Sequence, residues 1–128
     1  MKEKIIREGQ IFYGTHADLL NELGFRTKQG LSFNGYQKGT YEIDYDTYVW
    51  MAHIDGKVRN MWKNTKKGEM IIEENLDEKV HSIGITHDTR WVFEKFNGYL
   101  IFRGVYKLRK ASTNKVRILD KVAKEIVL

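Results

Sequence analysis

The chain has 128 residues, of which 41% are hydrophobic and 30% charged, and this composition fits one globular domain over residues 1–128 with a single core. Because the chain has no cysteine, disulfide bonds and thiolate metal sites are excluded. The formal net charge of +5 favours a polyanion as partner, and no apolar run has the length of a signal peptide or a membrane span, so we expect a cytoplasmic protein without membrane contact.

Charge is unevenly distributed along the chain. A first basic segment over residues 57–67 contains no acidic residue, and an acidic block over residues 69–78 follows it. A second basic segment runs from Arg103 to Lys124, with Asp120 as its single acid. Basic segments of this kind assist binding to phosphates through steering and counterion release.

The N-terminal part predicts a strand followed by a short helix. The strand covers Gln10 to Tyr13 and stops at Gly14. Thr15 is a suitable N-cap, because its hydroxyl can accept a hydrogen bond from a backbone N–H two or three residues further on. Three leucines form the apolar side, and Gly24 is a natural C′ terminator. We expect a helix of two turns that packs on the sheet, with His16 solvated at its start.

Residues 25–39 are polar and contain glycine at regular intervals, which predicts turns and a surface loop. They do not form a phosphate-binding loop, because the glycines do not lead from a strand into a helix. A loop of this kind can still line the mouth of a binding site.

A second β unit is expected over residues 40–62. Tyrosine and isoleucine alternate with acidic residues over residues 41–46, which is the two-residue period of a strand with one wet face. A strand from Tyr48 to Ile54 follows, and Asp55-Gly56 predicts a tight hairpin turn after it. The returning arm of this hairpin carries Trp62 on one side.

Three shorter segments lie before the next hairpin. Residues 64–68 are expected to be a polar turn. Residues 70–72 are apolar and fit either a strand or the first turn of a helix. Residues 80–85 are expected to form a strand.

The strongest local signal lies in residues 91–108, where two runs of aromatic and β-branched residues meet at Asn97-Gly98. Asn-Gly between such runs predicts a two-residue β-hairpin, because both turn residues take positive φ. One face of the second arm is fully apolar, and Gly104 lies within that face. A glycine at this position predicts a bulge, a sharp bend or the close approach of another backbone.

The tail over residues 115–128 has apolar residues near the spacing of an amphipathic helix. A strand over Val116 to Leu119 that leads into a shorter helix fits nearly as well. The predicted fold is therefore α+β: a curved antiparallel sheet or a small, partly open β-barrel, with one short N-terminal helix and a C-terminal helix or strand and helix.

The segment FNGYLIFRGVYKL is a hairpin that ends in aromatic-x-Gly-Val-Tyr-x-Leu and is followed by a basic segment. It resembles the closing strands of PUA-like barrels, a superfamily that includes SRA and ASCH domains and small modules of bacterial restriction and helicase proteins. The resemblance covers the last third of the chain. It implies a curved sheet that binds nucleic acid, in some members through a flipped or modified base held in an aromatic-lined pocket. No pocket residue of the family can be placed on this sequence.

Aromatic residues interleaved with basic ones are the composition of a nucleic-acid surface, because bases stack on aromatic rings and cations contact phosphates. Several of these aromatics must also serve the core of so small a domain. Trp62 is the best exposed candidate, since a basic turn follows it, and Arg103 is the best candidate for a charge that faces a groove. The candidate nucleic-acid-binding residues are Trp50, Arg59, Trp62, Lys63, Lys66, Lys67, Arg90 and Arg103. We therefore predict a module that recognises nucleic acid, DNA or RNA, or nucleotides, including a modified or flipped base.

Other functions remain open at this point. His53, Asp55 and His81 could converge as a metal or catalytic site, but nothing in the sequence forces them together, and no catalytic residue, metal or cofactor is assigned. A protein-interaction or inhibitor module of the phage or mobile-element type is the first alternative, with the acidic block imitating phosphate. A small enzyme that depends on histidine or a metal is the second, and a binder of small ligands is also possible.

Overall fold

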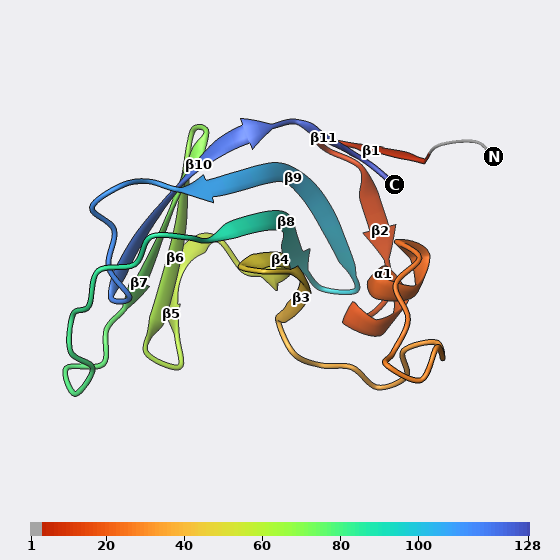
Figure 1. Ribbon diagram of the computed structural model, residues 1–128, viewed down its shortest axis with the longest axis horizontal. Helices are drawn as coiled ribbons and strands as arrows, with labels where there is room; N and C mark the ends of the chain where they lie inside the picture. The colour runs from red at the N-terminus through yellow and green to blue at the C-terminus, as the bar shows by residue number, and fades with distance from the viewer. Residues whose placement is uncertain (1–3) are drawn as a thin grey trace.

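The computed structural model describes residues 4–128, which form eleven strands and one short helix (Figure 1). The elements are β1 (Ile5–Arg7), β2 (Ile11–Tyr13), α1 (His16–Glu22), β3 (Thr40–Asp44), β4 (Thr47–Ala52), β5 (Asp55–Arg59), β6 (Trp62–Lys67), β7 (Met70–Asn75), β8 (Thr89–Phe96), β9 (Tyr99–Leu108), β10 (Val116–Ala123) and β11 (Glu125–Val127). The main sheet has the order β3-β4-β8-β9-β10-β7-β6-β5, with β2 beside β9, while β1 and β11 form a separate pair.

The main sheet is curved and mixed. Its outer strands β3 and β5 do not pair with each other, so the sheet over residues 4–128 is not closed into a barrel. All its neighbouring strands are antiparallel except β4 and β8, which run parallel with Trp50 opposite Val92. The α+β fold with a curved, mainly antiparallel sheet is confirmed, and this one parallel pair makes the sheet mixed.

Strand β9 is the long bent element that joins two hydrophobic cores (Figure 1). Leu100 and Phe102 on its first half belong to the core beneath α1 and β2, whereas Tyr106 on its second half belongs to the core under β10. The bend lies at Gly104, which has φ +126°. Gly104 pairs with Val92 while Phe102 pairs with the next residue, Phe93, so β9 has one extra residue at this point. The bulge expected at this glycine is confirmed, and it lets one strand line both cores.

The helix α1 follows local rules. Thr15 accepts a hydrogen bond from the Asp18 backbone N–H while the Asp18 carboxylate accepts one from the Thr15 N–H, which is a capping box. Gly24 follows the last turn with φ +91°, as a C′ residue does. His16 is only 8% exposed, so the expectation of a solvated residue at the helix start is wrong.

The Asn97-Gly98 hairpin is confirmed as the β8–β9 turn, although only Gly98 of the two turn residues has positive φ, and the hairpin expected at Asp55-Gly56 is wrong. These two residues lie inside β5, and the turn that follows is Asn60-Met61, with φ of +49° and +68°. Strand β4 pairs with β3 and β8 instead of with β5. Tertiary pairing has therefore overridden a favourable local turn.

Three further expectations are corrected. Residues 64–68 are not a turn, because β6 extends through Lys67 and the turn follows at residues 68–69. Residues 70–72 begin strand β7 rather than a helix, while residues 80–85 lie in a loop with one isolated bridge at Gly84. The tail forms β10 and β11 and no helix.

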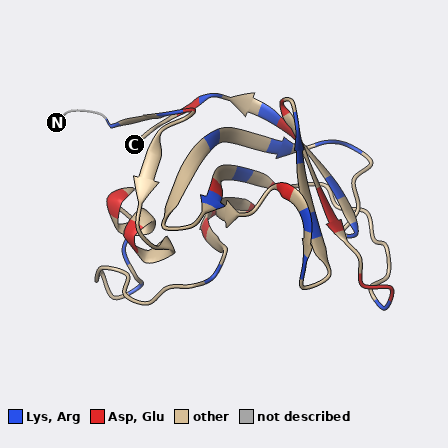
Figure 2. Cartoon of the chain, turned by 180° about the vertical axis from the view of Figure 1, so that it is seen from behind, with Lys and Arg blue, Asp and Glu red and all other residues tan. Residues whose placement is uncertain are grey.

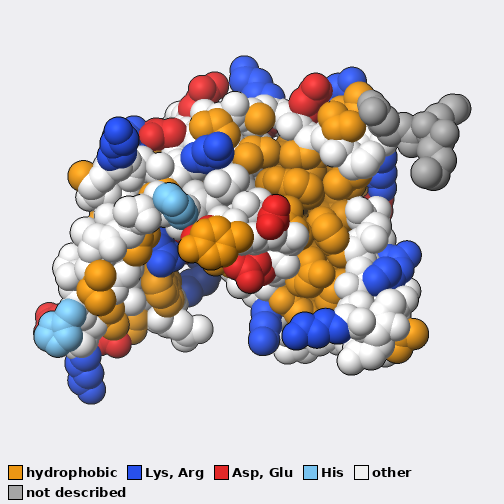
Figure 3. All heavy atoms as spheres, in the orientation of Figure 1, with side chains coloured by type: hydrophobic (Ala, Val, Ile, Leu, Met, Phe, Trp, Pro, Cys, Tyr) orange, Lys and Arg blue, Asp and Glu red, His pale blue; other side chains and the backbone are white. Residues whose placement is uncertain are grey.

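The curvature places two parts of the sheet opposite each other. We call β5, β6 and β7 the arm, and α1 with β2, β3 and β4 the lobe. The space-filling view is hollowed between them (Figure 3). Within residues 4–128, no helix combines the length and apolar character that a membrane crossing requires.

Candidate nucleic-acid interface

A buried group of charges connects the arm to β8. The Arg90 guanidinium donates to both carboxylate oxygens of Glu73, at 3.0 Å each, and to both oxygens of Asp88, at 3.0 and 2.7 Å. Arg117 donates to the same Glu73 carboxylate at 3.1 Å. Two cations thus balance two anions, which is the condition for burying charge without a large penalty.

The group remains ionised because its members compensate one another. Burial opposes the charged form of Glu73, but the positive charges and hydrogen bonds of Arg90 and Arg117 outweigh it and hold its pKa below the usual value. Burial likewise opposes the charged form of Arg90, but Glu73 and Asp88 outweigh it and raise the pKa of this guanidinium. The Arg90 guanidinium also lies 4.4 Å from the centre of the Trp50 ring, a cation–π contact that fixes the indole.

Strand register explains how distant residues reach this point. Asn64 on β6 and Arg117 on β10 both oppose Glu73 on β7, so the three side chains project from one face of the sheet. Trp62 lies two residues before Asn64 on that face, and Arg59 on β5 opposes it. The arm therefore presents a row of aromatic, amide and charged side chains toward the lobe.

The first cavity, which we call the cleft, lies between this row and β4. Its volume is about 450 Å³, within the range of small-ligand pockets. The cleft is lined by Gly39, Trp50, Met51, Ala52, His53, Lys57, Arg59, Asn60, Trp62, Asn64 and Glu73. Two indole rings, an imidazole, two exposed basic side chains and a buried carboxylate thus surround one space.

Asn64 carries an unused hydrogen-bond acceptor in the wall of the cleft. Its Nδ2 donates to the backbone carbonyl of His53 at 3.0 Å, which fixes the orientation of the amide. Its Oδ1 is buried and has no partner among residues 4–128. An unsatisfied buried polar atom costs about 1–3 kcal/mol, so a donor that reached this oxygen would stabilise the protein.

His53 forms the aromatic rim of the cleft on the lobe side. Burial, followed by the positive charges of Arg59 and Lys95, lowers the pKa of its imidazole. The ring is therefore neutral at pH 7 and offers one donor and one acceptor. Among residues 4–128, no three His, Asp or Glu residues are placed to hold a metal ion. Asp55 pairs with Arg59 at 2.8 Å, and His81 lies exposed on the loop before β8, so the convergence considered for these residues with His53 does not occur.

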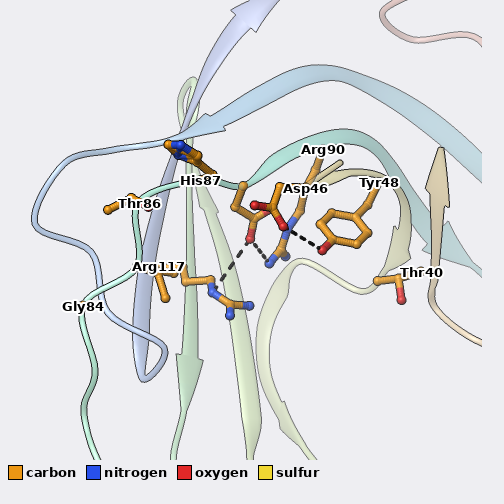
Figure 4. A pocket seen from close by; sticks show the side chains of 10 residues that line it. Thr40, Asp46, Tyr48, Gly84, Thr86, His87, Arg90 and Arg117 are labelled. Atoms are coloured by element: carbon orange, nitrogen blue, oxygen red, sulfur yellow. Dashed lines mark hydrogen bonds and ion pairs between the residues drawn. The ribbon is translucent and has the colours of Figure 1, made fainter. Parts of the chain in front are cut away.

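A second cavity lies beside the same charge group, at Arg90 and Asp88, with a volume of about 550 Å³ (Figure 4). Tyr48 and Asp46 line one side and Arg117 lines the other. The Tyr48 hydroxyl donates to Asp46 at 3.4 Å, and burial together with nearby Glu42 and Asp46 raises the pKa of this tyrosine. This cavity is more ionic than the cleft and has no indole in its wall.

Three of the predicted nucleic-acid-binding residues line the cleft: Trp50, Arg59 and Trp62. Trp50 is 5% exposed and Arg90 is 4% exposed. Arg90 lies beneath Trp50, and its guanidinium is already bound by Glu73, so it supports the wall of the cleft. Arg103 pairs with Glu94 at 2.8 Å and does not line the cleft.

The three lysines of β6 lie outside the cleft. Lys63 opposes Glu74, Lys66 donates to the Gly68 carbonyl at 2.9 Å, and Lys67 ends the strand in solvent. Figure 2 shows basic and acidic positions on neighbouring strands of the arm, so the acidic block of the sequence is not a continuous strip. Its central residue, Glu73, is buried among arginines.

The chain is thus a module with a curved sheet and a cleft lined by two tryptophans. No protein-family model matches the chain, and no curated protein matches it by sequence. Among solved structures, it is similar to the 5-hydroxymethylcytosine-specific restriction enzyme AbaSI, with a TM-score of 0.67 and 22% sequence identity. The match covers 95% of this chain and 42% of AbaSI, so the chain spans less than half of that protein.

At this identity the likeness concerns the fold. It extends over nearly the whole chain, whereas the resemblance to PUA-like modules in the sequence covered only the last third. The curved-sheet fold is therefore supported across the chain.

Proposed function

We propose that the protein recognises nucleic acid by receiving a base with an exocyclic amine, a modified cytosine included, in the cleft. The unpaired Oδ1 of Asn64 carries the proposal, because it needs an N–H donor and an exocyclic amine supplies one. Glu73 opposes Asn64 across β6 and β7, but its carboxylate is already bound by Arg90 and Arg117, so the Asn64 oxygen is the acceptor left for a ligand.

The remaining walls suit the other parts of a nucleotide. Trp62 is 36% exposed and provides aromatic surface, and stacking a base on such a ring contributes about 1–3 kcal/mol, whereas Trp50 is 5% exposed and closes the wall of the cleft. Lys57 is exposed at the rim, where it is available to a phosphate, while Arg59 is exposed beside it but forms an ion pair with Asp55. AbaSI, which shares the fold, is specific for 5-hydroxymethylcytosine, and this supports the choice of cytosine derivatives as first ligands.

The test is fluorescence-anisotropy titration of labelled single- and double-stranded oligonucleotides that contain cytosine, 5-methylcytosine or 5-hydroxymethylcytosine. Binding is expected to be salt-sensitive, and Trp62→Ala is expected to weaken it about 5- to 150-fold through lost stacking. Tyr13→Ala is the matched control, because Tyr13 is an aromatic residue that is 74% exposed and does not line the cleft. Absence of binding at low salt, or equal losses in both variants, would contradict the proposal.

A further inference from the structure

A separate cavity lies next to the cleft and contains a buried histidine without a full set of partners. Its volume is about 560 Å³, and its wall is formed by Gly14, Thr15, His16, Tyr36, Gln37, Lys95, Phe96, Gly98, Tyr99 and Leu100. It lies at the turn of the β8–β9 hairpin, beside the start of α1, and shares no lining residue with the cleft.

His16 gives this cavity a defined chemistry. Its Nδ1–H donates to the carbonyl oxygen of Lys38 at 2.9 Å, which leaves Nε2 as the acceptor of a neutral ring. Burial, and to a lesser extent the nearby Lys95 charge, lowers the pKa of this imidazole, so the neutral form prevails at pH 7. The Nε2 atom is buried and has no partner among residues 4–128, although the residue is 8% exposed.

The rest of the wall is aromatic and cationic. Phe96 and Tyr99 are stacked on each other, with ring centres 5.1 Å apart, and Tyr36 lines the cavity from the loop before β3. Lys95 supplies a positive charge. An acceptor, aromatic side chains and a cation around one space fit a flat heteroaromatic ring that has an N–H donor and an attached anion.

The cavity and the cleft are separated by a short stretch of the loop before β3. Tyr36 and Gln37 line the cavity, the Lys38 carbonyl holds His16, and Gly39 lines the cleft. His53 of the cleft also lies close enough to Lys95 for the lysine charge to affect its pKa. Two neighbouring nucleotides of one strand would therefore supply a base and a phosphate to each of the two spaces.

We propose that this cavity is a second nucleotide site, in which His16 accepts a hydrogen bond from a base N–H and Lys95 contacts the phosphate. The placement of a strand across both spaces rests on the function proposed for the cleft. The recognition of a nucleotide by the cavity itself does not, since a free mononucleotide has the same base and phosphate.

The experiment is two-dimensional NMR of the ¹⁵N-labelled protein during titration with CMP, with AMP and with inorganic phosphate. Residue-resolved signals separate the sites: the backbone amides of residues 95–99 report the cavity, while the Trp62 indole and the Asn64 side-chain amide report the cleft. We expect saturable shifts at residues 95–99 with at least one nucleotide and weaker ones with phosphate. Titration with a short oligonucleotide then tests whether one strand spans both spaces: a spanning strand should shift both sets of signals with one dissociation constant, whereas separately bound nucleotides shift each set with its own.

Two variants test the named contacts. His16→Asn retains an amide donor for the Lys38 carbonyl but has no atom at the Nε2 position, and Lys95→Gln removes the charge from a half-buried side chain. Each is expected to raise the nucleotide dissociation constant at residues 95–99 about tenfold while Trp62→Ala leaves it unchanged. Thermal unfolding checks that the variants are folded. If residues 95–99 do not respond to either nucleotide, or if both variants bind like the parent protein, the second site is refuted, whatever happens in the cleft.

Discussion

Asn64 combines a satisfied donor and an unsatisfied acceptor in one side chain, and this separates its structural role from its proposed binding role. Replacing it by the similarly shaped leucine removes the hydrogen bond to the His53 carbonyl, worth about 1 kcal/mol, and also removes an orphan oxygen of comparable cost. We therefore expect Asn64→Leu to change the free energy of unfolding by less than about 1 kcal/mol but to weaken oligonucleotide binding about tenfold. Urea denaturation and anisotropy on the same preparation measure the two quantities. A large loss of stability with unchanged affinity would show that Asn64 serves only the fold.

At the scale of single elements, Gly104 determines the bend of β9. Its φ of +126° is strained for any residue with a side chain, and a Cβ placed there would lie 2.8 Å from the Ala123 carbonyl oxygen of β10. We expect Gly104→Ala to lower the free energy of unfolding by about 1–3 kcal/mol, because it adds backbone strain at a position already in close contact. Gly98→Ala is the control, since its turn also has positive φ but a Cβ there meets no atom within 4 Å. If both variants lose the same amount, strain alone explains the effect, and the close approach of β10 contributes nothing.

Elements whose signals are local could be predicted from the sequence, and elements whose pairing is remote could not. Asn97-Gly98 and the Thr15 cap operate within a few residues, so the hairpin and the helix are predictable. Asp55-Gly56 is an equally good local turn, but β4 is taken up by the parallel pairing with β8 that no short motif announces. The tail has helical spacing because Val116 and Val122 are apolar but exposed on β10, so they complete a period that the buried Leu119 and Ile126 do not share.

The candidate site follows the same division. Composition identifies Trp50, Arg59 and Trp62 as aromatic and basic candidates, and they do meet in the cleft. Asn64 and Glu73 escape notice, since their importance arises from the pairing of β6 with β7 and from the approach of β7 to β8 across the curved sheet. The sequence around Asn64 is typical of a polar turn, and the sequence around Glu73 is typical of an exposed acidic segment.

At the scale of the whole molecule, the pair between Glu73 and Arg90 ties together strands that β9 and β10 separate in the sheet, and so it holds the curvature. Because the pKa of Glu73 is lower in the folded protein than its ordinary value of 4.5, its ionised form stabilises the fold above about pH 4.5. That stabilisation is lost as the pH falls further and the carboxylate is protonated. The pKa values of Glu8 and Asp120 are also lowered, by hydrogen bonds from Lys121 and Arg109, so the parent protein loses stability on acidification from several sites.

Glu73→Gln isolates the contribution of the buried pair. It leaves the Arg90 and Arg117 guanidinium groups with Asp88 as the one remaining anion of the group, so we expect it to lower the free energy of unfolding at pH 7 by about 3–5 kcal/mol. The variant should also lose less stability than the parent protein between pH 5 and pH 3, because one titrating group is gone. Urea denaturation across this pH range measures both effects, and Glu78→Gln on the exposed loop after β7 is the control. If Glu73→Gln and the parent protein lose stability in parallel on acidification, the curvature is held by the two hydrophobic cores and not by the buried charges.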